Sequence, residues 1–443
     1  MLSLRCQGCA TEVAIPQTGA VPLVCPKHGD GGDHVLLPAL PLPSLCGDQD
    51  ESQPFLRFAD RMLAFHRCTA IGRAEMYADI VRRLDARITT LTGQSFSQTP
   101  LFRSEALSEH FGLSEHGGVW IKNETGNPGG SHKGRHLFAL MVELFVGEAL
   151  TSEPQKQTPA PLAIASCGNA ALAAAVVAKA AERRLLVFIP TDAEASVVSA
   201  LRDLDAEITV CERRAGESGD PCYLRFQAAV RSGAIPFCCQ GPDNGLTIEG
   251  GQTLLAEALC EISRTGRTLS RVMVQVGGGA LASSCALAIE TGLHNGLLQQ
   301  RPRFYTAQTE SAAPLLRAWQ RLLDAYGEAL PTLSDSGWSQ VAAHKRRYMW
   351  PWEQAPHSVA HGILDDETYD WLSVIQAMAR SAGRPLVAPE QTIVAAHSLA
   401  VRATEIAVTA TGTAGLAGLL QLQKEEPLHP HENVLCLFTG VMR

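Results

Sequence analysis

The chain has 443 residues, which is enough to bury a large core and to form two or more lobes. Apolar residues make up 46% of the sequence and charged residues 19%, proportions typical of a globular enzyme. The net charge of −8 argues against nucleic acid or an anionic membrane as a partner, and no apolar run reaches the roughly 18 residues that a membrane span needs.

The beginning of the chain, MLSLRCQGCATEV, lacks the apolar core of a signal peptide. Without an export signal, the 13 cysteines predict reduced thiols and not a disulfide framework. We therefore expect a cytoplasmic protein that acts on a small molecule, with no nucleic acid and no membrane among its partners.

The amino-terminal segment is rich in cysteine and proline and contains no long amphipathic helix. Cys6 and Cys9 form a C-x-x-C pair, and Cys25 and His28 form a C-x-x-H pair after an interval of 15 residues. Each pair can chelate a metal from one tight turn, and two such turns complete a tetrahedral zinc site. We predict a structural zinc site in a small ribbon, with His34 as the alternative fourth ligand. A ribbon without metal is the competing interpretation.

Helical periodicity comes next in the chain, and strands then alternate with helices. The segments 54–68 and 74–88 are amphipathic at helical period. After them we predict, in order, a strand at 118–124, a helix at 137–150, a strand at 162–165, a helix at 169–184, a strand at 185–190, a helix at 194–204, strands at 207–211 and 271–276, a helix at 281–292, a strand at 303–309, a helix at 413–423 and a strand at 434–438. Continuous apolar strands alternating with helices predict an α/β fold with parallel sheets covered by helices on both faces. Linkers are predicted at 151–161, 212–221 and 425–433.

Small or glycine-rich loops follow three of the predicted strands, at the sheet edge where open α/β sheets bind ligands. SCGNAA follows 162–165, GGGALASS follows 271–276, and TGVMR follows 434–438. The first two loops lead into helices, whose unpaired N–H groups and dipole favour an anion. The glycine run suits a phosphate, and the serine–asparagine loop suits a carboxylate. Two other interpretations of the glycine run are a tight turn and a dinucleotide motif, but the acidic residue that the dinucleotide motif expects is absent.

A lysine lies at the start of a predicted helix, within the stretch NETGNPGGSHKGRH at 123–136. Taken alone, Lys133 is most simply a solvated surface residue, and in a ligand site it is either an anion clamp or a nucleophile. A lysine on a glycine loop, together with a phosphate loop and a carboxylate loop, fits the chemistry of pyridoxal phosphate (PLP).

The same motifs carry a family resemblance. GGSHKGRH resembles the lysine motif of the fold-type II PLP-dependent enzymes, the tryptophan synthase β-like group, and ASCGNAALAAA and VGGGAL resemble its serine–glycine–asparagine and phosphate loops. NGLTIEGGQTLLAE, TATGTAGLAGLL and VLCLFTGVMR resemble three further motifs of the group. The likeness runs from about 95 to 443 with all motifs in order. It is strongest to the threonine synthase and threonine–serine dehydratase branch.

The resemblance implies roles for individual residues. Lys133 would link to PLP and later act as the base at the substrate α-carbon, and Thr439 would face the pyridine nitrogen and leave it neutral. The implied phosphate ligands are Gly277, Gly278, Gly279, Ala280 and Leu281. Asn169 would bind the ring oxygen of the cofactor, and the substrate carboxylate would be bound by Ser166, Cys167, Gly168, Asn169 and Ala170. Arg135 and Lys122 are candidate cations for a phosphorylated substrate, although either could instead pair with Glu124.

The predicted activity is a PLP-dependent lyase acting on an amino acid with a β- or γ-leaving group, such as serine, threonine or a phosphorylated relative. Elimination would give a keto acid and ammonia, or a replacement product. The alternatives are a threonine synthase-type reaction on phosphohomoserine and a non-catalytic PLP-binding regulatory protein. We expect a Cys/His ribbon at 1–50, a large PLP-binding domain at 51–150 and 237–443, and a small mobile domain at 151–236. The resemblance also implies a homodimer.

Overall fold

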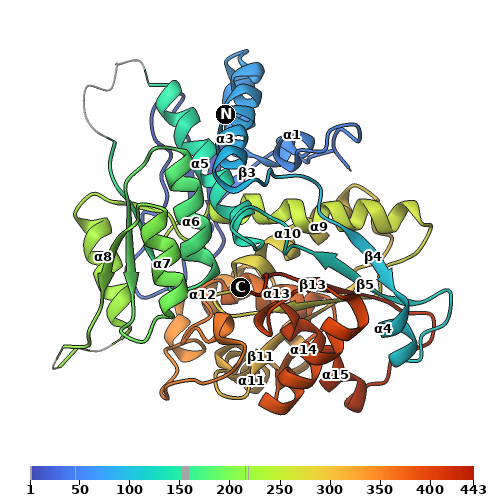
Figure 1. Cartoon of the computed structure of the whole chain (residues 1–443). Helices are drawn as coiled ribbons and strands as arrows, with labels where there is room; N and C mark the ends of the chain where they lie inside the picture. Colours follow the sequence, from blue (N-terminus) through green and yellow to red (C-terminus); the bar gives the residue numbers. More distant parts are fainter. Residues whose placement is uncertain (1, 45, 152–158, 215, 218) are drawn as a thin grey trace.

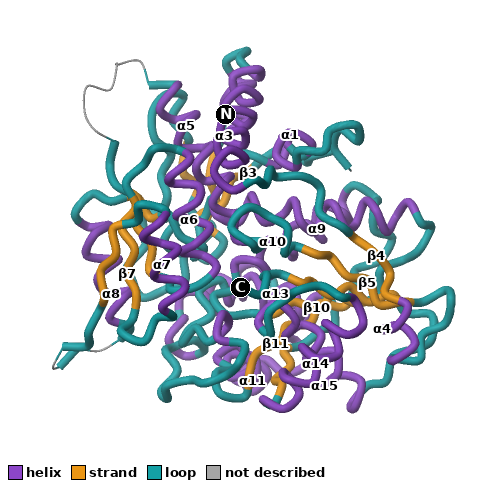
Figure 2. The backbone as a smooth tube through the Cα atoms, viewed as in Figure 1, coloured by secondary structure: helices purple, strands orange, loops and turns teal. Residues whose placement is uncertain are grey.

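The computed structural model in Figure 1 describes residues 2–44, 46–151, 159–214, 216–217 and 219–443. Most of the linker predicted at 151–161 therefore lies outside the described residues. The described residues form a three-stranded, a six-stranded and a four-stranded sheet. Figure 2 shows the four-stranded sheet at one side of the molecule and the six-stranded sheet at the other, with helices packed around both. The predicted α/β fold with two open sheets is confirmed.

The amino-terminal ribbon is an antiparallel sheet with strand order β2-β1-β3. Its strands are β1 (Ser3–Cys6), β2 (Glu12–Ala14) and β3 (Leu36–Ala39). The helices that follow are α1 (Pro54–Arg57), η1 (Ala59–Arg61), α2 (Leu63–Ala70) and α3 (Ala74–Thr92). The single helix predicted at 54–68 is thus broken twice, at Phe58 and at Met62. Both residues leave helical backbone angles, and both side chains are buried.

The six-stranded sheet has the order β12-β11-β10-β13-β5-β4. The strands are β4 (Leu101–Ser104), β5 (Gly118–Asn123), β10 (Arg271–Gln275), β11 (Arg303–Thr309), β12 (Pro385–Ala388) and β13 (Asn433–Phe438). All neighbouring pairs are parallel except β4 and β5, which are antiparallel. Sequence periodicity did not predict this antiparallel edge, because a four-residue strand gives too short a pattern.

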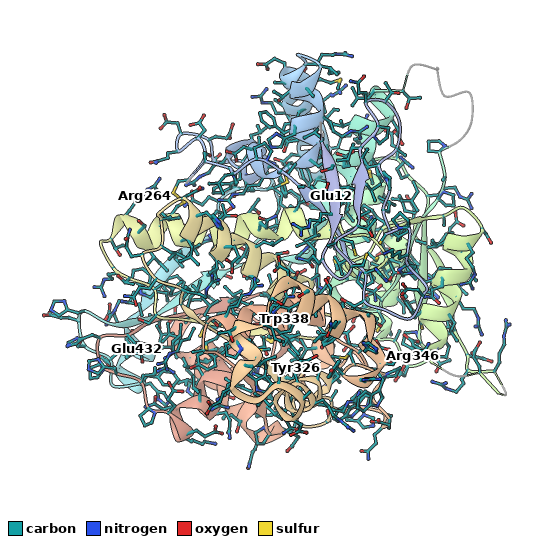
Figure 3. The ribbon with its side chains drawn as sticks, turned by 180° about the vertical axis from the view of Figure 1, so that it is seen from behind. Glu12, Arg264, Tyr326, Trp338, Arg346 and Glu432 are labelled. Carbon is teal, nitrogen blue, oxygen red and sulfur yellow. A yellow bond between two sulfur atoms is a disulfide. The ribbon has the colours of Figure 1, made fainter. Side chains whose placement is uncertain are left out.

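Both faces of the six-stranded sheet are buried, as the continuous apolar strands predict. In β10, Val272 and Val274 belong to the hydrophobic cluster that contains residues of α9 and α10, whereas Met273 belongs to the cluster that contains residues of α14 and α15. The helices of this part are α4 (Glu105–His110), α5 (Lys133–Ala149), α9 (Thr247–Arg264), α10 (Ala280–His294), α11 (Pro314–Tyr326), η2 (Gly327–Thr332), α12 (Asp335–Ala343), η3 (Lys345–Arg347), η4 (His361–Ile363), α13 (Trp371–Arg380), α14 (Glu390–Thr404), η5 (Thr411–Thr413) and α15 (Ala414–Glu425). Figure 3 shows the molecule from behind, with Trp338 of α12 near the middle and Arg264 at the end of α9 toward the rim.

The four-stranded sheet is wholly parallel, with strand order β8-β7-β6-β9. Its strands are β6 (Leu162–Ala165), β7 (Leu185–Ile189), β8 (Glu207–Val210) and β9 (Ile235–Pro236), and its helices are α6 (Asn169–Ala180), α7 (Ala195–Asp203) and α8 (Pro221–Arg231). The alanines of α6 are mostly buried, and their small size lets α6 pack closely against α5 and α3. Helix α6 is therefore one of the elements that attach the four-stranded sheet to the rest of the molecule.

A disulfide bond joins Cys46 to Cys260 in α9, across a sequence separation of 214 residues. The prediction that all thiols are reduced is wrong for this pair. Sequence reasoning missed the bond because the two cysteines become neighbours only when the chain after the ribbon packs on α9. Within the described residues, no helix is both long enough and apolar enough to cross a membrane.

Candidate active site

A cleft of about 1130 Å³ is lined by residues of both parallel sheets. Its wall is made by the loops after β6, β7, β10 and β13 and by the segment 351–369. Parallel strands place their carboxyl ends at one edge, and this is where the sequence predicts ligands. The predicted site residues that line the cleft are Lys133, Ser166, Cys167, Gly168, Asn169, Ala170, Gly277, Gly278, Gly279, Ala280, Leu281 and Thr439.

Lys133 is the first residue of α5 and is half-buried in the wall of the cleft. The loop before it is bonded to the end of the last strand: Ser131 and Gly440 form a β-bridge, and the backbone N–H of His132 donates to the Thr439 carbonyl at 3.2 Å. Among the described residues, no hydrogen bond or ion pair engages the Lys133 amine. The amine is therefore available to a ligand in the cleft.

Two buried histidines flank this lysine. Burial lowers the pKa of His132 well below its ordinary value, and the charge of Lys133 lowers it further. The same two causes lower the pKa of His136 to about 3. Both rings are therefore neutral at pH 7, and neither adds a positive charge beside the lysine.

The glycine loop at 277–279 connects β10 to the 15-residue helix α10. Gly279 has a φ of 101°, in the left-handed region that favours glycine. A Cβ on Gly277 would lie 2.1 Å from Asp365 Oδ2, and a Cβ on Gly279 would lie 3.0 Å from Thr368 Cγ2. The run of glycines is thus required by the close approach of the segment 363–370, a reason that the sequence did not reveal. The loop N–H groups at the start of α10 can still bind an anion.

The hydroxyl of Thr439 is positioned by Gln275, the last residue of β10. The Gln275 Nε2 group donates to Thr439 Oγ1 at 2.6 Å and to the backbone carbonyls of Gly412 and Leu437, each at 3.1 Å. Because carbonyl oxygens only accept, these bonds fix the direction of the amide. Thr439 Oγ1 is thus an acceptor for Gln275, and its own proton remains free to be donated into the cleft. Sequence reasoning missed Gln275, although a polar residue at the end of an apolar strand was the available signal.

Asn169 begins α6, and its side chain faces the end of β13. Arg443 Nη1 donates to Asn169 Oδ1 at 2.8 Å, and a Cβ on Gly440 would lie 2.7 Å from Asn169 Nδ2. With Oδ1 accepting from the guanidinium, Nδ2 is left as a donor. The small residue at 440 makes room for this amide.

Arg135 does not line the cleft, so its expected role in binding a phosphorylated substrate is wrong. Its side chain is fully buried and donates to Glu124 and Glu257, with the closest contacts at 2.7 Å. Lys122 is also fully buried and pairs with Glu257 at 2.7 Å. Both cations are neutralised inside the protein, because a buried charge without a partner would be strongly destabilising.

Residues 93–440 match the family model described as "Pyridoxal-phosphate dependent enzyme". The chain belongs to this family. Among curated relatives, it is 27% identical to a threonine synthase of Mycobacterium leprae over 345 residues, which cover 77% of this chain and 80% of that protein. It is also 27% identical to a biosynthetic L-threonine dehydratase of Haemophilus influenzae over 214 residues, or 48% of this chain. The match spans only 37% of the length of that dehydratase.

Solved structures support the fold of this PLP-dependent enzyme. Maize serine racemase superposes with a TM-score of 0.57 at 18% identity, covering 82% of this chain and 92% of that one. The processed form of threonine deaminase isoform 2 from Solanum lycopersicum superposes with a TM-score of 0.57 at 16% identity, covering 84% of this chain and 91% of that one. At these identities the likeness shows the fold alone.

The residues around the cleft fit the cofactor that the family implies. The glycine loop at the start of α10 offers backbone donors for a phosphate, Lys133 offers an unengaged amine, and Asn169 and Thr439 each keep a free donor. The match is chemical, since each donor type suits one polar group of pyridoxal phosphate. Gly277, Gly278 and Gly279 would hold the phosphate, and Lys133 the aldehyde carbon.

A second group of ligand-type residues lies in the ribbon. The Sγ atoms of Cys6, Cys9 and Cys25 and a ring nitrogen of His34 all lie within 4.8 Å of one another. His34 Nε2 contacts Asp30 Oδ1 at 2.9 Å, an outer partner that leaves Nδ1 to face Cys6 at 3.5 Å. Three cysteines and one histidine suit zinc.

His28 is not in this group, so the predicted set of ligands is corrected. Its side chain is exposed, and its backbone N–H closes a turn onto the Cys25 carbonyl at 2.8 Å. Pairing of β1 with β3, in which Cys6 is opposite Leu36, brings His34 beside the cysteines instead. Strand pairing places His34, and not His28, in this group, and spacing in the sequence could not decide between them.

Proposed function

We propose that this enzyme is a lyase that removes a β- or γ-leaving group from an amino acid, with serine, threonine or a relative as substrate. The observation that carries the proposal is the presence of Thr439 and Lys133 in one cleft, with the Thr439 hydroxyl bonded to Gln275 at 2.6 Å. A hydroxyl leaves the cofactor nitrogen neutral, which favours elimination and replacement over transamination. When bound, pyridoxal phosphate takes up the electron pair left at the α-carbon.

Separate residues of the chain would bind the cofactor, bind the substrate and remove the proton. The Lys133 amine would hold the cofactor and would also serve as the base that removes the proton from the α-carbon of the substrate. The loop at 166–170 and the first turn of α6 bind the substrate carboxylate through backbone N–H groups. Asn169 Nδ2 would donate to the ring oxygen of the cofactor. His132 packs beside the lysine as a neutral ring.

The second candidate is a threonine synthase-type replacement on phosphohomoserine. It is favoured by the M. leprae threonine synthase, which matches a larger share of this chain than the dehydratase does. The engagement of Arg135 and Lys122 in buried ion pairs speaks against a second phosphate in the cleft. A non-catalytic, regulatory PLP-binding protein is the third candidate.

A screen with two readouts separates these candidates. Purified protein supplied with PLP is mixed with serine, threonine, their O-phosphates and phosphohomoserine, and released ammonia and phosphate are measured. Release of ammonia supports the lyase, and release of phosphate from phosphohomoserine supports the synthase. Release of neither product from any substrate supports the binding protein. Borohydride treatment followed by peptide mass analysis tests the shared premise, since the cofactor mass should be found on Lys133 and be lost in Lys133→Ala.

Three further properties complete the proposal. The ribbon would hold one structural zinc ion on Cys6, Cys9, Cys25 and His34. The segment 151–236 would act as a small domain that closes over the substrate. The enzyme would be a cytoplasmic homodimer.

A further inference from the structure

The segment 363–370 wraps around the glycine loop that would hold the cofactor's phosphate. At one end, a Cβ on Gly277 would lie 3.0 Å from Ile363 Cα. At the other, the backbone N–H of Asp370 donates to the Gly278 carbonyl at 2.9 Å. Between these two contacts, the Tyr369 ring lies against Gly278, since a Cβ atom on Gly278 would lie 3.1 Å from Tyr369 Cδ2. One continuous segment of the chain therefore contacts all three glycines of the loop.

Asp365 brings a carboxylate onto this loop. A Cβ atom on Gly277 would lie 2.1 Å from Asp365 Oδ2, and a Cβ atom on Gly278 would lie 3.7 Å from Asp365 Oδ1. Asp365 lines the same cleft as Gly277, Gly278 and Gly279. Burial raises the pKa of Asp365, while the charge of Lys133 opposes the rise. An acidic side chain thus lies directly against the backbone of the loop.

The charges around Asp365 make the conflict with a phosphate stronger. Asp366 and Asp220 also line the cleft, and the pKa of Asp366 is raised to about 6 by burial and by the nearby acids Glu367, Asp365 and Asp220. A phosphate dianion entering the loop would be repelled by these acids, and Asp365 is the one that lies against Gly277 and Gly278. Like charges at close range in a partly buried site weaken binding.

We propose that the Asp365 carboxylate opposes binding of the cofactor's phosphate at the glycine loop and so sets how tightly the enzyme retains pyridoxal phosphate. The proposal rests on the assignment of the cofactor to this cleft. Asp365 is a positioning residue for the loop and makes no contribution to the chemical step. Its effect is specific to the phosphate, because the carboxylate lies on the loop that would hold that group.

The test measures the equilibrium affinity of the full-length protein for two probes, pyridoxal phosphate and pyridoxal, which differ only in the phosphate. Asp365→Asn removes the charge at nearly constant shape, and Asp365→Ser is a second uncharged variant. Asp366→Asn is the matched control, since it removes the adjacent charge and leaves the Asp365 carboxylate against the glycine loop in place. Affinities are read from the quenching of protein fluorescence on titration.

Both Asp365 variants should bind pyridoxal phosphate about tenfold more tightly than the unaltered protein, the effect of removing one charged competitor. Their affinity for pyridoxal should stay unchanged, and the control should gain less affinity for pyridoxal phosphate, because Asp365 and not Asp366 lies against the glycines of the loop. Equal or weaker binding of pyridoxal phosphate by the Asp365 variants would overturn the proposal, as would an equal gain in Asp366→Asn. Failure of every protein to bind pyridoxal phosphate would instead refute the cofactor assignment.

Discussion

Arg135 Nη1 donates to Glu257 Oε1 at 2.7 Å, and both side chains are fully buried. The pair joins the first turn of α5, two residues after Lys133, to the middle of α9. Glu257 Oε2 also accepts from Lys122 of β5 at 2.7 Å. The Glu257 carboxylate of α9 therefore links β5 and α5, the helix that begins with Lys133.

Replacement of this carboxylate should destabilise the fold. Glu257→Gln leaves two buried cations with one negative charge fewer, and we expect the free energy of unfolding to fall by about 3 kcal/mol. Chemical denaturation followed by circular dichroism measures the change. Glu261→Gln is the control, because Glu261 lies 3.6 Å from the same lysine but is partly exposed, and its loss should cost below about 1 kcal/mol. Equal losses in the two variants would contradict the assigned role.

The same pair predicts a dependence of stability on pH. Burial alone would raise the pKa of Glu257, but Arg135 and Lys122 outweigh burial and lower it from 4.5 to about 2. A carboxylate with a lowered pKa in the folded state adds stability above its unfolded pKa and loses it as the pH falls toward the folded value. The difference in unfolding free energy between wild type and Glu257→Gln should therefore be full at pH 6 and shrink between about pH 4.5 and pH 2. If this difference in unfolding free energy grew as the pH was lowered, the predicted direction of the pH dependence would be wrong.

We expect substitution of Thr439 to change kcat more than it changes the amount of bound cofactor. Thr439→Ala removes the donor into the cleft, and we expect kcat to fall about tenfold, the effect of one lost hydrogen bond. Thr439→Ser keeps the hydroxyl and should remain within about twofold of the wild type. Turnover of the substrate identified by the ammonia and phosphate screen, with bound cofactor measured by absorbance, separates the two effects. Unchanged kcat in Thr439→Ala would show that the hydroxyl has no part in the reaction.

The ligand set of the ribbon can be tested by metal analysis. Protein purified with zinc should carry about one ion per chain, as a closed four-ligand site does. Cys25→Ser and His34→Gln should lose it, whereas His28→Gln should keep it, because the His28 side chain is exposed and lies outside the group. Loss of zinc in His28→Gln with retention in His34→Gln would restore the ligand set predicted from spacing.

Reduction of the Cys46–Cys260 bond should lower stability. The bond closes a loop of 214 residues, and long loops gain most from a cross-link, so we expect a loss of about 2 to 5 kcal/mol. Denaturation with and without a reducing agent measures it, and Cys46→Ser should abolish the dependence on the reductant. A reductant effect that persists in Cys46→Ser would point to another cause.

Local patterns in the sequence determined much of this protein. The strand at 271–276 and the helix at 281–292 were predicted close to their observed bounds in β10 and α10, because periodicity and apolar runs reflect burial of each element. The loops after the strands were found for the same reason, since parallel strands place their ends together. The family resemblance added candidate roles for Lys133, Asn169 and Thr439.

The tertiary structure alone decided how distant residues pair. His34 replaced His28 beside the cysteines because β1 pairs with β3, and Arg135 turned away from the cleft because Glu124 and Glu257 converge on it. Asp365 lies against the glycine loop only because the segment 363–370 packs on this loop before α13 begins. In each case the partner lies on another element, and the choice depends on packing and on neutralising buried charge, which the spacing of residues along the chain does not record.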